Sequence, residues 1–297
     1  MLTDLTVTSL LLLLLAPQHT SFLIKPRSSP KPPTGFCHRP LTSLKSSTIS
    51  QELSPIPNLD PSILNELSSQ DYAIVPNFLT EEQVDAIIED IHSLRSDDKF
   101  SVAGIGQDAS NTINSSIRKT ETMFIYPKLQ FPTPALTFLY PTLSKLSSTL
   151  TSKFNLNLSP FLHEALYAYY PHGGYYKRHV DAVPSSASIL RSFSFLIYLN
   201  KSWKPEDGGC LRLYTDVDDD SKYKDVEPTS GKLVIFKSDK LPHEVLETSA
   251  ERLAVVGWFN REVTASDIGN LGGGDLVRKL PIFIASAVLV GVGVSML

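Results

Sequence analysis

The sequence is poor in cysteine: its 297 residues include only Cys37 and Cys210. Two thiols cannot form the disulfide framework of a small secreted domain or a zinc site built from cysteines. Basic residues are not in surplus, because 27 Lys and Arg stand against 31 Asp and Glu, and the net charge of −4 argues against a nucleic-acid partner. The chain also lacks an internal repeat, a glycine-rich phosphate loop and a Gly-x-Ser-x-Gly elbow. Its hydrophobic content of 42% is that of a folded protein with one or two domains.

Acidic residues are nearly absent from residues 1–51, where Asp4 stands against five Lys and Arg residues, so this part carries +4 and the rest carries −8. The apolar run from Leu10 to Ala16 is too short to span a bilayer and has the length of a signal-peptide core. Residues 17–50 are rich in Ser, Thr and Pro and resemble a transit peptide. We therefore expect residues 1–50 to be a disordered, signal- and transit-like leader for entry through the secretory pathway, to a plastid or the endoplasmic reticulum. A secretory signal followed by a disordered linker is the alternative.

The C-terminal residues 280–297 carry no charge. Eighteen helical residues are about 27 Å long, just enough to cross a thin bilayer. Arg278 and Lys279 precede this run and would mark the side from which it inserts. We expect residues 280–297 to be a transmembrane anchor that makes the protein membrane-associated, with residues 263–279 as a linker. A buried terminal helix or strand is the alternative.

Residues 60–262 carry the periodic patterns of one folded domain. Thr80 and Gln83 form a capping-box pattern before apolar residues at helical spacing, which predicts a helix over residues 80–94; further helices are expected over 64–69 and 141–154. Residues 72–75 read as a short strand, and residues 100–120 as a loop or hairpin. Short apolar runs separated by turn residues then predict seven strands, over 165–170, 175–180, 193–199, 209–214, 232–236, 245–247 and 253–259. The pattern favours a mainly β fold, a double-stranded β-helix or jelly roll, with the N-terminal helices packed on one sheet.

A His-x-Asp pattern ends one of these strands at His179 and Asp181. Residues i and i+2 of a strand face the same side, so an imidazole and a carboxylate could bind one metal ion together. His243 begins a later strand, 62 residues beyond Asp181, and adjacent strands of a jelly roll would bring it near. Two histidines and one carboxylate form the facial triad of non-haem Fe(II) sites.

Arg252 lies nine residues after His243, at the start of an apolar strand. An arginine fork in such surroundings requires a planar carboxylate partner. The far carboxylate of 2-oxoglutarate would fit, provided that its keto-acid end chelates the iron.

With these residues in place, the region resembles the Fe(II)/2-oxoglutarate-dependent dioxygenases. Within them it resembles the prolyl 4-hydroxylase family, of the HIF prolyl hydroxylase (EGL-nine) type. The resemblance covers about residues 70–262. It is carried, in family order, by Tyr170-Pro171, Arg178-His179-Val180-Asp181, Ile197-Tyr198-Leu199-Asn200-Lys201 with Trp203, Gly208-Gly209 with Leu211-Arg212, Val226-Glu227-Pro228, Pro242-His243-Glu244-Val245, and Arg252 with Trp258.

The resemblance implies a role for each matching residue. His179, Asp181 and His243 would bind iron and form the catalytic centre. Arg252 and Tyr198 would hold the C5 carboxylate of 2-oxoglutarate, and Tyr170 would contact its chelating end. The remaining two, Arg191 and Trp258, would seat the substrate. The cofactors implied are Fe(II), 2-oxoglutarate, O₂ and L-ascorbate, and the partner is a protein or peptide that contains proline.

The substrate is the least determined part, because residues 100–120, at the position of the family's substrate-covering loop, have a sequence of their own. The same chemistry on a free amino acid or another small molecule stays open, as does a metal-binding sensor module without turnover. A dry pocket is required, and we expect its wall to come from apolar residues that alternate along the strands. They are Phe193, Phe195, Ile197, Leu211, Val234, Val255 and Trp258.

Overall fold

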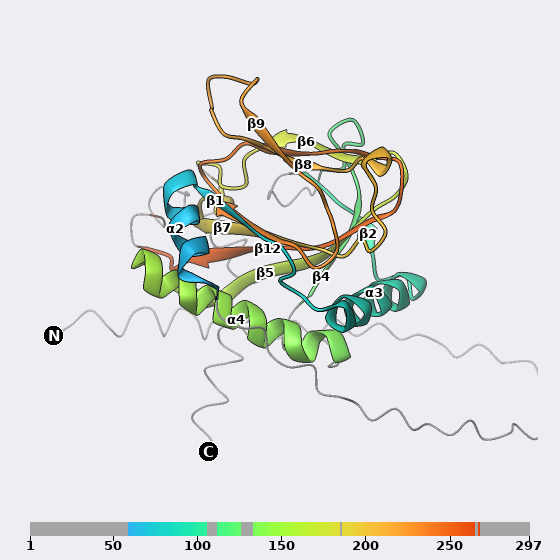
Figure 1. Ribbon diagram of the computed structural model, residues 1–297, viewed down its shortest axis with the longest axis horizontal. Coiled ribbons are helices and arrows are strands. Elements are labelled where there is room, and N and C mark those ends of the chain that lie inside the picture. Colours follow the sequence, from blue (N-terminus) through green and yellow to red (C-terminus); the bar gives the residue numbers. More distant parts are fainter. Residues whose placement is uncertain (1–58, 106–111, 126–132, 185, 265–266, 268–297) are drawn as a thin grey trace, which may run out of the picture. The chain divides into compact units, whose positions relative to one another are not determined.

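The computed structural model describes residues 59–105, 112–125, 133–184, 186–264 and 267. Their core consists of two sheets in which every strand pairing is antiparallel (Figure 1). The larger sheet has the order β1 (Tyr72–Val75), β10 (Leu233–Lys237), β7 (Arg191–Tyr198), β12 (Arg252–Arg261), β5 (Leu158–Tyr170), β4 (Glu121–Phe124) and β2 (Ser101–Val102). The smaller sheet has the order β3 (Arg118–Lys119), β6 (Gly174–His179), β11 (His243–Thr248), β8 (Leu211–Tyr214) and β9 (Tyr223–Val226). Two 3₁₀ turns, Ala187–Leu190 and Pro205–Asp207, lie in the connections.

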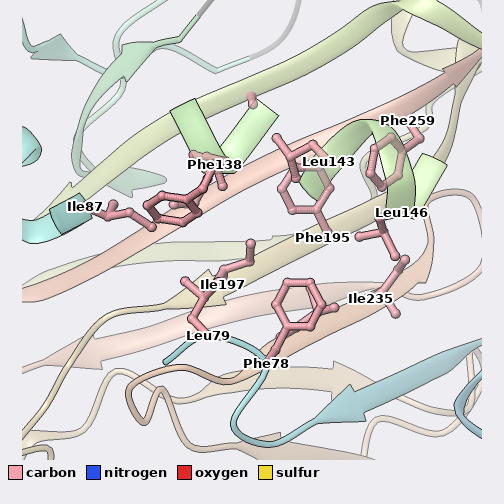
Figure 2. Packing of buried hydrophobic residues seen from close by; sticks show 14 of the residues in the cluster. Phe78, Leu79, Ile87, Phe138, Leu143, Leu146, Phe195, Ile197, Ile235 and Phe259 are labelled. Atoms are coloured by element: carbon pink, nitrogen blue, oxygen red, sulfur yellow. The ribbon is translucent and has the colours of Figure 1, made fainter. Parts of the chain in front are cut away.

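Three α-helices lie against the larger sheet, on the face away from the smaller one (Figure 1). They are α2 (Pro61–Gln70), α3 (Glu81–Ser96) and α4 (Pro134–Phe154). Figure 2 shows Ile87 of α3 beside Phe138 of α4, and Leu143 of α4 beside Phe195 of the sheet. This arrangement confirms the predicted fold class, a mainly β jelly roll with helices packed on one sheet.

The predicted helix boundaries agree with the structure to within about three residues, except at the start of α4. At α3 the capping box is present, since the Thr80 side chain accepts a hydrogen bond from the Gln83 amide and the Gln83 side chain accepts one from Thr80. In contrast, α4 begins about two turns before the predicted start at Pro141. Thr133 caps this helix and Pro134 occupies its first turn, where a missing N–H costs nothing. Pro141 therefore lies inside the helix.

The seven predicted strands are all present, with ends that shift by at most two residues except at β5, which begins seven residues before its predicted start. The sequence patterns did not predict β9, nor the short strands β2, β3 and β4. Two of these lie within the loop or hairpin expected over residues 100–120: β2 pairs with β4 and β3 pairs with β6, while Ile105 and Thr112 form an isolated antiparallel bridge.

Alternation along the larger sheet divides its side chains between two cores. Phe193, Phe195, Ile197 and Val255 face the helices, in the core that also contains α3 and α4. The predicted pocket wall is therefore wrong for these four residues. The other three expected wall residues, Leu211, Val234 and Trp258, lie in the second core, between the two sheets. The space between the sheets is where the polar residues described below also gather.

The leader predicted over residues 1–50 and the anchor predicted over residues 280–297 lie outside the described residues, as does most of the linker 263–279. In the part of the chain that is described, no helix combines the length and the apolar character needed to cross a membrane.

Candidate active site

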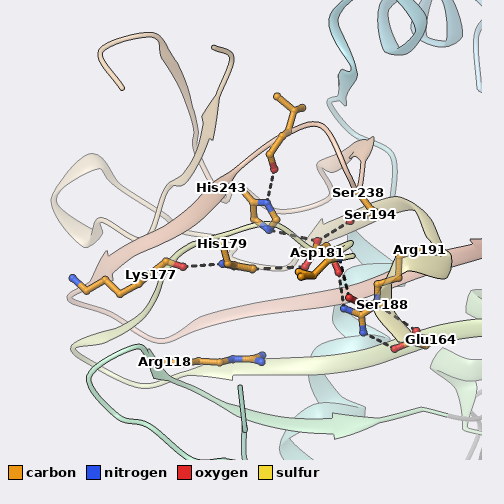
Figure 3. A network of polar contacts seen from close by, with 12 residues as sticks. Arg118, Glu164, Lys177, His179, Asp181, Ser188, Arg191, Ser194, Ser238 and His243 are labelled. Atoms are coloured by element: carbon orange, nitrogen blue, oxygen red, sulfur yellow. Dashed lines mark hydrogen bonds and ion pairs between the residues drawn. The ribbon is translucent and has the colours of Figure 1, made fainter. Parts of the chain in front are cut away.

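The two histidines of the predicted triad face each other across a strand pair. His179 ends β6 and His243 begins β11, and the two residues are direct partners in the antiparallel register. Asp181 follows two residues after His179, where β6 has ended. Its carboxylate oxygens lie 3.7 Å from Nε2 of His179 and 3.5 Å from Nε2 of His243 (Figure 3). One ligand atom from each of the three residues lies within 4.8 Å of the other two, a spacing that suits a single metal ion.

Backbone carbonyls fix the orientation of both imidazole rings. Nδ1 of His179 lies 2.7 Å from the carbonyl oxygen of Lys177, and Nδ1 of His243 lies 3.0 Å from that of Leu241. Because a carbonyl oxygen can only accept, each Nδ1 carries the proton. In the neutral ring this leaves the lone pair on Nε2, on the side of Asp181, which is the tautomer that a metal ion requires.

Burial sets the charge state of this group. The surrounding protein lowers the pKa of His179 to about 3, because burial disfavours the imidazolium and His243 would repel it. Burial alone would raise the pKa of Asp181, but the two imidazoles, Arg191 and the Ser194 hydroxyl outweigh it and lower the pKa to about 2. At neutral pH the site thus presents a neutral His179 imidazole and a carboxylate, the states in which these groups ligate metals.

Arg252, at the start of β12, is the largest fully buried side chain of the domain, with 1% exposure. Its Nε donates to the carbonyl oxygen of Gly209 at 2.8 Å, whereas Nη1 and Nη2 have no hydrogen-bond partner among the described residues. Its guanidinium carbon lies 4.8 Å from the ring centroid of Tyr170 and 5.1 Å from that of Tyr198. Buried polar groups without partners are rare, and an unpartnered fork of two N–H groups is complementary to a carboxylate.

Tyr198 adds a third donor at this point. Its side chain is fully buried, and its hydroxyl has no partner within the described part of the chain. Burial raises the pKa of Tyr198, although the Arg252 charge opposes this, so the hydroxyl keeps its proton. The two orphaned N–H groups and the hydroxyl fit the far carboxylate of 2-oxoglutarate.

Arg191 and Trp258 form a separate group beside Asp181. Arg191 makes a two-point ion pair with Glu164, at 2.6 Å and 3.3 Å, and its guanidinium stacks on the Trp258 ring at 3.7 Å. Its Nη1 also lies 3.5 Å from the backbone oxygen of Asp181. The indole N–H of Trp258 is buried and lacks a partner in the described ranges. Arg191 thus lies at the site, but its charge is already neutralised by Glu164.

Comparison with known proteins agrees with this geometry. Residues 165–260, which include all eight predicted site residues, match the family model of the 2OG-Fe(II) oxygenase superfamily. These residues form a 2OG-Fe(II) oxygenase domain. The protein is thus an oxidoreductase, and the expected resemblance to the prolyl 4-hydroxylases is confirmed.

Three solved structures illustrate the similarity of the oxygenase. A prolyl-4-hydroxylase from Pseudomonas putida is 28% identical, with a TM-score of 0.58, and the match covers 68% of this chain and 98% of that one. A prolyl hydroxylase from Trichoplax adhaerens, solved with a peptide of the hypoxia inducible factor oxygen degradation domain, is 26% identical, with a TM-score of 0.58 and coverages of 67% and 87%. A prolyl 4-hydroxylase from Phytophthora capsici shares the fold, at 22% identity, a TM-score of 0.54 and coverages of 73% and 71%.

The oxygenase site also contains residues that the sequence did not single out. Tyr176 stacks on the His179 ring with centroids 3.7 Å apart. Arg118 lies over the Tyr176 ring, 4.5 Å from its centroid. The stack depends on a bulge, since the three-residue step from Tyr176 to His179 on β6 faces only a two-residue step on β11. An odd spacing would otherwise place Tyr176 and His179 on opposite faces.

Proposed function

We propose that this oxygenase hydroxylates a prolyl residue of a protein or peptide at C4, using 2-oxoglutarate and O₂ and releasing succinate and CO₂. The proposal rests on the His–Asp–His group together with the buried guanidinium of Arg252, whose Nη1 and Nη2 have no hydrogen-bond partner among the described residues. An anion with a planar carboxylate relieves the cost of that orphaned charge, and 2-oxoglutarate offers such a group. The similarity to two prolyl hydroxylases at 28% and 26% identity supports the prolyl substrate.

The residues have separate tasks in this proposal. His179, Asp181 and His243 would hold Fe(II), which would activate O₂, the oxidant of the hydroxylation, when 2-oxoglutarate is bound. Arg252 and Tyr198 hold the C5 carboxylate of 2-oxoglutarate and so orient the molecule. Tyr170, which is paired with Arg252 in the sheet, contacts the chelating end of 2-oxoglutarate.

The substrate side of the site is formed by Arg191 and Trp258. Their stacked side chains form a flat, rigid surface next to Asp181, and Glu164 holds the guanidinium in place. A pyrrolidine ring is compact and apolar, and it packs well on such a surface. Apolar residues between the sheets, among them Leu211 and Val234, help to keep the site dry.

Succinate release tests the chemistry. We expect the full chain, supplied with Fe(II), L-ascorbate, 2-oxoglutarate and a proline-containing peptide library, to release succinate. The His243→Ala variant should lose the activity, since it lacks one of three metal ligands. Equal succinate release by both proteins would contradict the proposal.

Mass spectrometry of the products tests the substrate class. A mass gain of about 16 on a peptide proline, equal to one oxygen atom, supports the prolyl assignment. The same gain on free proline or another small molecule, with every peptide unchanged, would replace it with the small-molecule alternative.

We further propose that residues 1–50 direct the enzyme into the secretory pathway, toward a plastid or the endoplasmic reticulum, and that residues 280–297 attach it to a membrane. The charge pattern of both segments supports this. A fluorescent protein fused to each segment alone should be found in the membrane fraction with the tail and inside an organelle with the leader. Diffuse cytosolic fluorescence of either fusion would contradict its part of the proposal.

A further inference from the structure

Two buried serine hydroxyls lie in a row behind Asp181. Ser194 on β7 donates to Oδ2 of Asp181 at 2.7 Å, and its oxygen lies 2.8 Å from the hydroxyl of Ser238, which follows β10 (Figure 3). The exposure of Ser194 is 1% and that of Ser238 is 0%. Neither residue belongs to the His–Asp–His group, and neither contacts Arg252 or its tyrosines through a hydrogen bond.

The surroundings of Ser194 are otherwise apolar. In the sheet register it lies between Phe236 on one side and Trp258 on the other. A buried hydroxyl in such a place costs free energy unless its hydrogen bonds are satisfied. An alanine would fill this position more simply if packing were the only requirement.

Chemistry fixes the direction of both hydrogen bonds. The Asp181 carboxylate can only accept, so Ser194 must donate its single proton to Oδ2. The Ser194 oxygen is then available only as an acceptor for Ser238, and Ser238 must donate to it. The row therefore has one polarity, Ser238 to Ser194 to Asp181, and each bond strengthens the next.

The backbone of Ser238 also holds the segment that contains Asp181. Its carbonyl oxygen accepts from the amide of Ala182, the residue directly after Asp181, at 3.1 Å, and its own amide donates to the carbonyl oxygen of Ser192 at 3.1 Å. Asp181 is thus fixed at its carboxylate and at the next peptide group. Oδ1, the oxygen nearer His179, accepts no hydrogen bond from the residues that the structure describes.

We propose that Ser194 and Ser238 are positioning residues that hold the Asp181 carboxylate for its metal, with Oδ2 committed to the serine row and Oδ1 left for the ion. This rests on the proposed function, in which Asp181 is a metal ligand. Partners of this kind orient a ligand and tune its basicity, and their loss lowers metal affinity by about 10- to 100-fold.

Metal titration of the full chain tests the proposal without turnover. Co(II) is the probe, because its visible absorption reports the coordination while calorimetry gives the affinity. We expect Ser194→Ala to bind Co(II) about 10- to 100-fold more weakly and with an altered visible spectrum. The Ser194→Thr variant, which keeps the hydroxyl, should bind Co(II) with close to wild-type affinity, a change well below that roughly 10- to 100-fold range.

A double-mutant cycle separates the effect of the two hydrogen-bonded serines on Co(II) affinity from a general effect of core packing. Ser238→Ala should weaken Co(II) binding in the wild-type background but add almost nothing in the Ser194→Ala background, since Ser238 acts through Ser194. The matched control is Ser147→Ala, which removes the hydroxyl of a buried serine on α4 and should leave Co(II) affinity unchanged.

Wild-type Co(II) affinity in Ser194→Ala, or equal losses in Ser194→Ala and Ser194→Thr, would overturn the proposal. If Ser194→Ala does not fold, Ser238→Ala decides alone, and unchanged affinity and spectrum there would overturn it. If the His–Asp–His group does not hold a metal, the result is different, because the wild type and His243→Ala would then bind Co(II) equally; a different substrate would leave all of these Co(II) results unchanged.

Discussion

Replacement of Arg252 by methionine separates the effect of this residue on the stability of the fold from its role in 2-oxoglutarate binding. Arg252 is a buried cation whose two terminal nitrogens have no partner in the described structure, so the protein without cosubstrate carries a destabilising group. We expect Arg252→Met to make the cosubstrate-free protein more stable while abolishing 2-oxoglutarate binding.

The magnitudes follow from the hydrogen bonds. Two unsatisfied buried donors cost about 1–3 kcal/mol each, and the lost bond from Nε to the Gly209 carbonyl is worth about 1.5–3 kcal/mol. The free energy of unfolding should therefore rise by about 2 kcal/mol, which is a Tm increase of about 4–8 °C for a domain of this size. Loss of two charge-assisted bonds to the carboxylate should weaken 2-oxoglutarate binding by about 3–6 kcal/mol, or roughly 100-fold to 10⁴-fold.

Thermal unfolding with and without 2-oxoglutarate and Mn(II) measures both effects. Arg191→Met is the matched control, because the side chain of Arg191 is only 10% exposed and its charge is paired with Glu164. Its loss leaves that carboxylate without its cation and should destabilise the protein by about 3 kcal/mol. If Arg252→Met lowered the Tm of the cosubstrate-free protein as much as Arg191→Met does, the Arg252 guanidinium would be satisfied by the fold and our reasoning would be refuted.

Three further changes have expected outcomes. Tyr198→Phe removes a buried, unpartnered hydroxyl, so calorimetry should find 2-oxoglutarate affinity lowered about 10-fold and the Tm of the cosubstrate-free protein not lowered; unchanged affinity would contradict the role of Tyr198. Gly257→Ala places a Cβ 2.4 Å from the backbone oxygen of Glu164, so urea unfolding should show a loss of about 3 kcal/mol or more, and a loss under 1 kcal/mol would count against that contact. Arg261 lowers the pKa of Asp267 through a two-point ion pair, so Asp267 stabilises the fold above the unfolded pKa and less as pH falls below it. Unfolding of Asp267→Asn between pH 7 and pH 2 should therefore show a deficit against wild type that shrinks below about pH 4; a deficit independent of pH would contradict it.

Local patterns in the sequence were sufficient to predict most of the elements and, with the expected strand neighbours, the triad. The capping box at Thr80 predicted the start of α3, and the spacing of His179 and Asp181 with His243 predicted a group that the structure brings within 4.8 Å. The first depends on one helical turn, and the second on strand alternation for His179 and Asp181 and on the expected adjacency of two jelly-roll strands for His243.

Contacts across strands could not be predicted in the same way. Glu164 meets Arg191, and Ser238 meets Ser194, only because the register of the larger sheet aligns segments far apart in the chain. Nothing in the spacing of these residues marks them as neighbours. The same applies to Tyr176, since a bulge opposite β11 cannot be inferred from β6 alone.

The prediction of the pocket wall was wrong for four residues for a different reason. Alternation along β7 separates Phe193, Phe195 and Ile197 from Ser194 and Tyr198, but it does not say which set faces the helices. The polar residues could have indicated the orientation, because the face of β7 that carries the hydroxyls of Ser194 and Tyr198 is the one that faces the site. The fully apolar set packs beneath the helices.

The site is divided between the two sheets. His179 and His243 belong to the smaller sheet, and Asp181 directly follows its strand β6, whereas the residues suited to the far carboxylate, Arg252, Tyr198 and Tyr170, all belong to the larger sheet. A molecule bound at both ends would therefore connect the two sheets, as a cross-link does. The three metal ligands lie on the smaller sheet and in the segment after β6, and Asp181 is linked to the larger sheet through its hydrogen bond from Ser194. Bound 2-oxoglutarate would therefore add a second connection that resists separation of the two sheets.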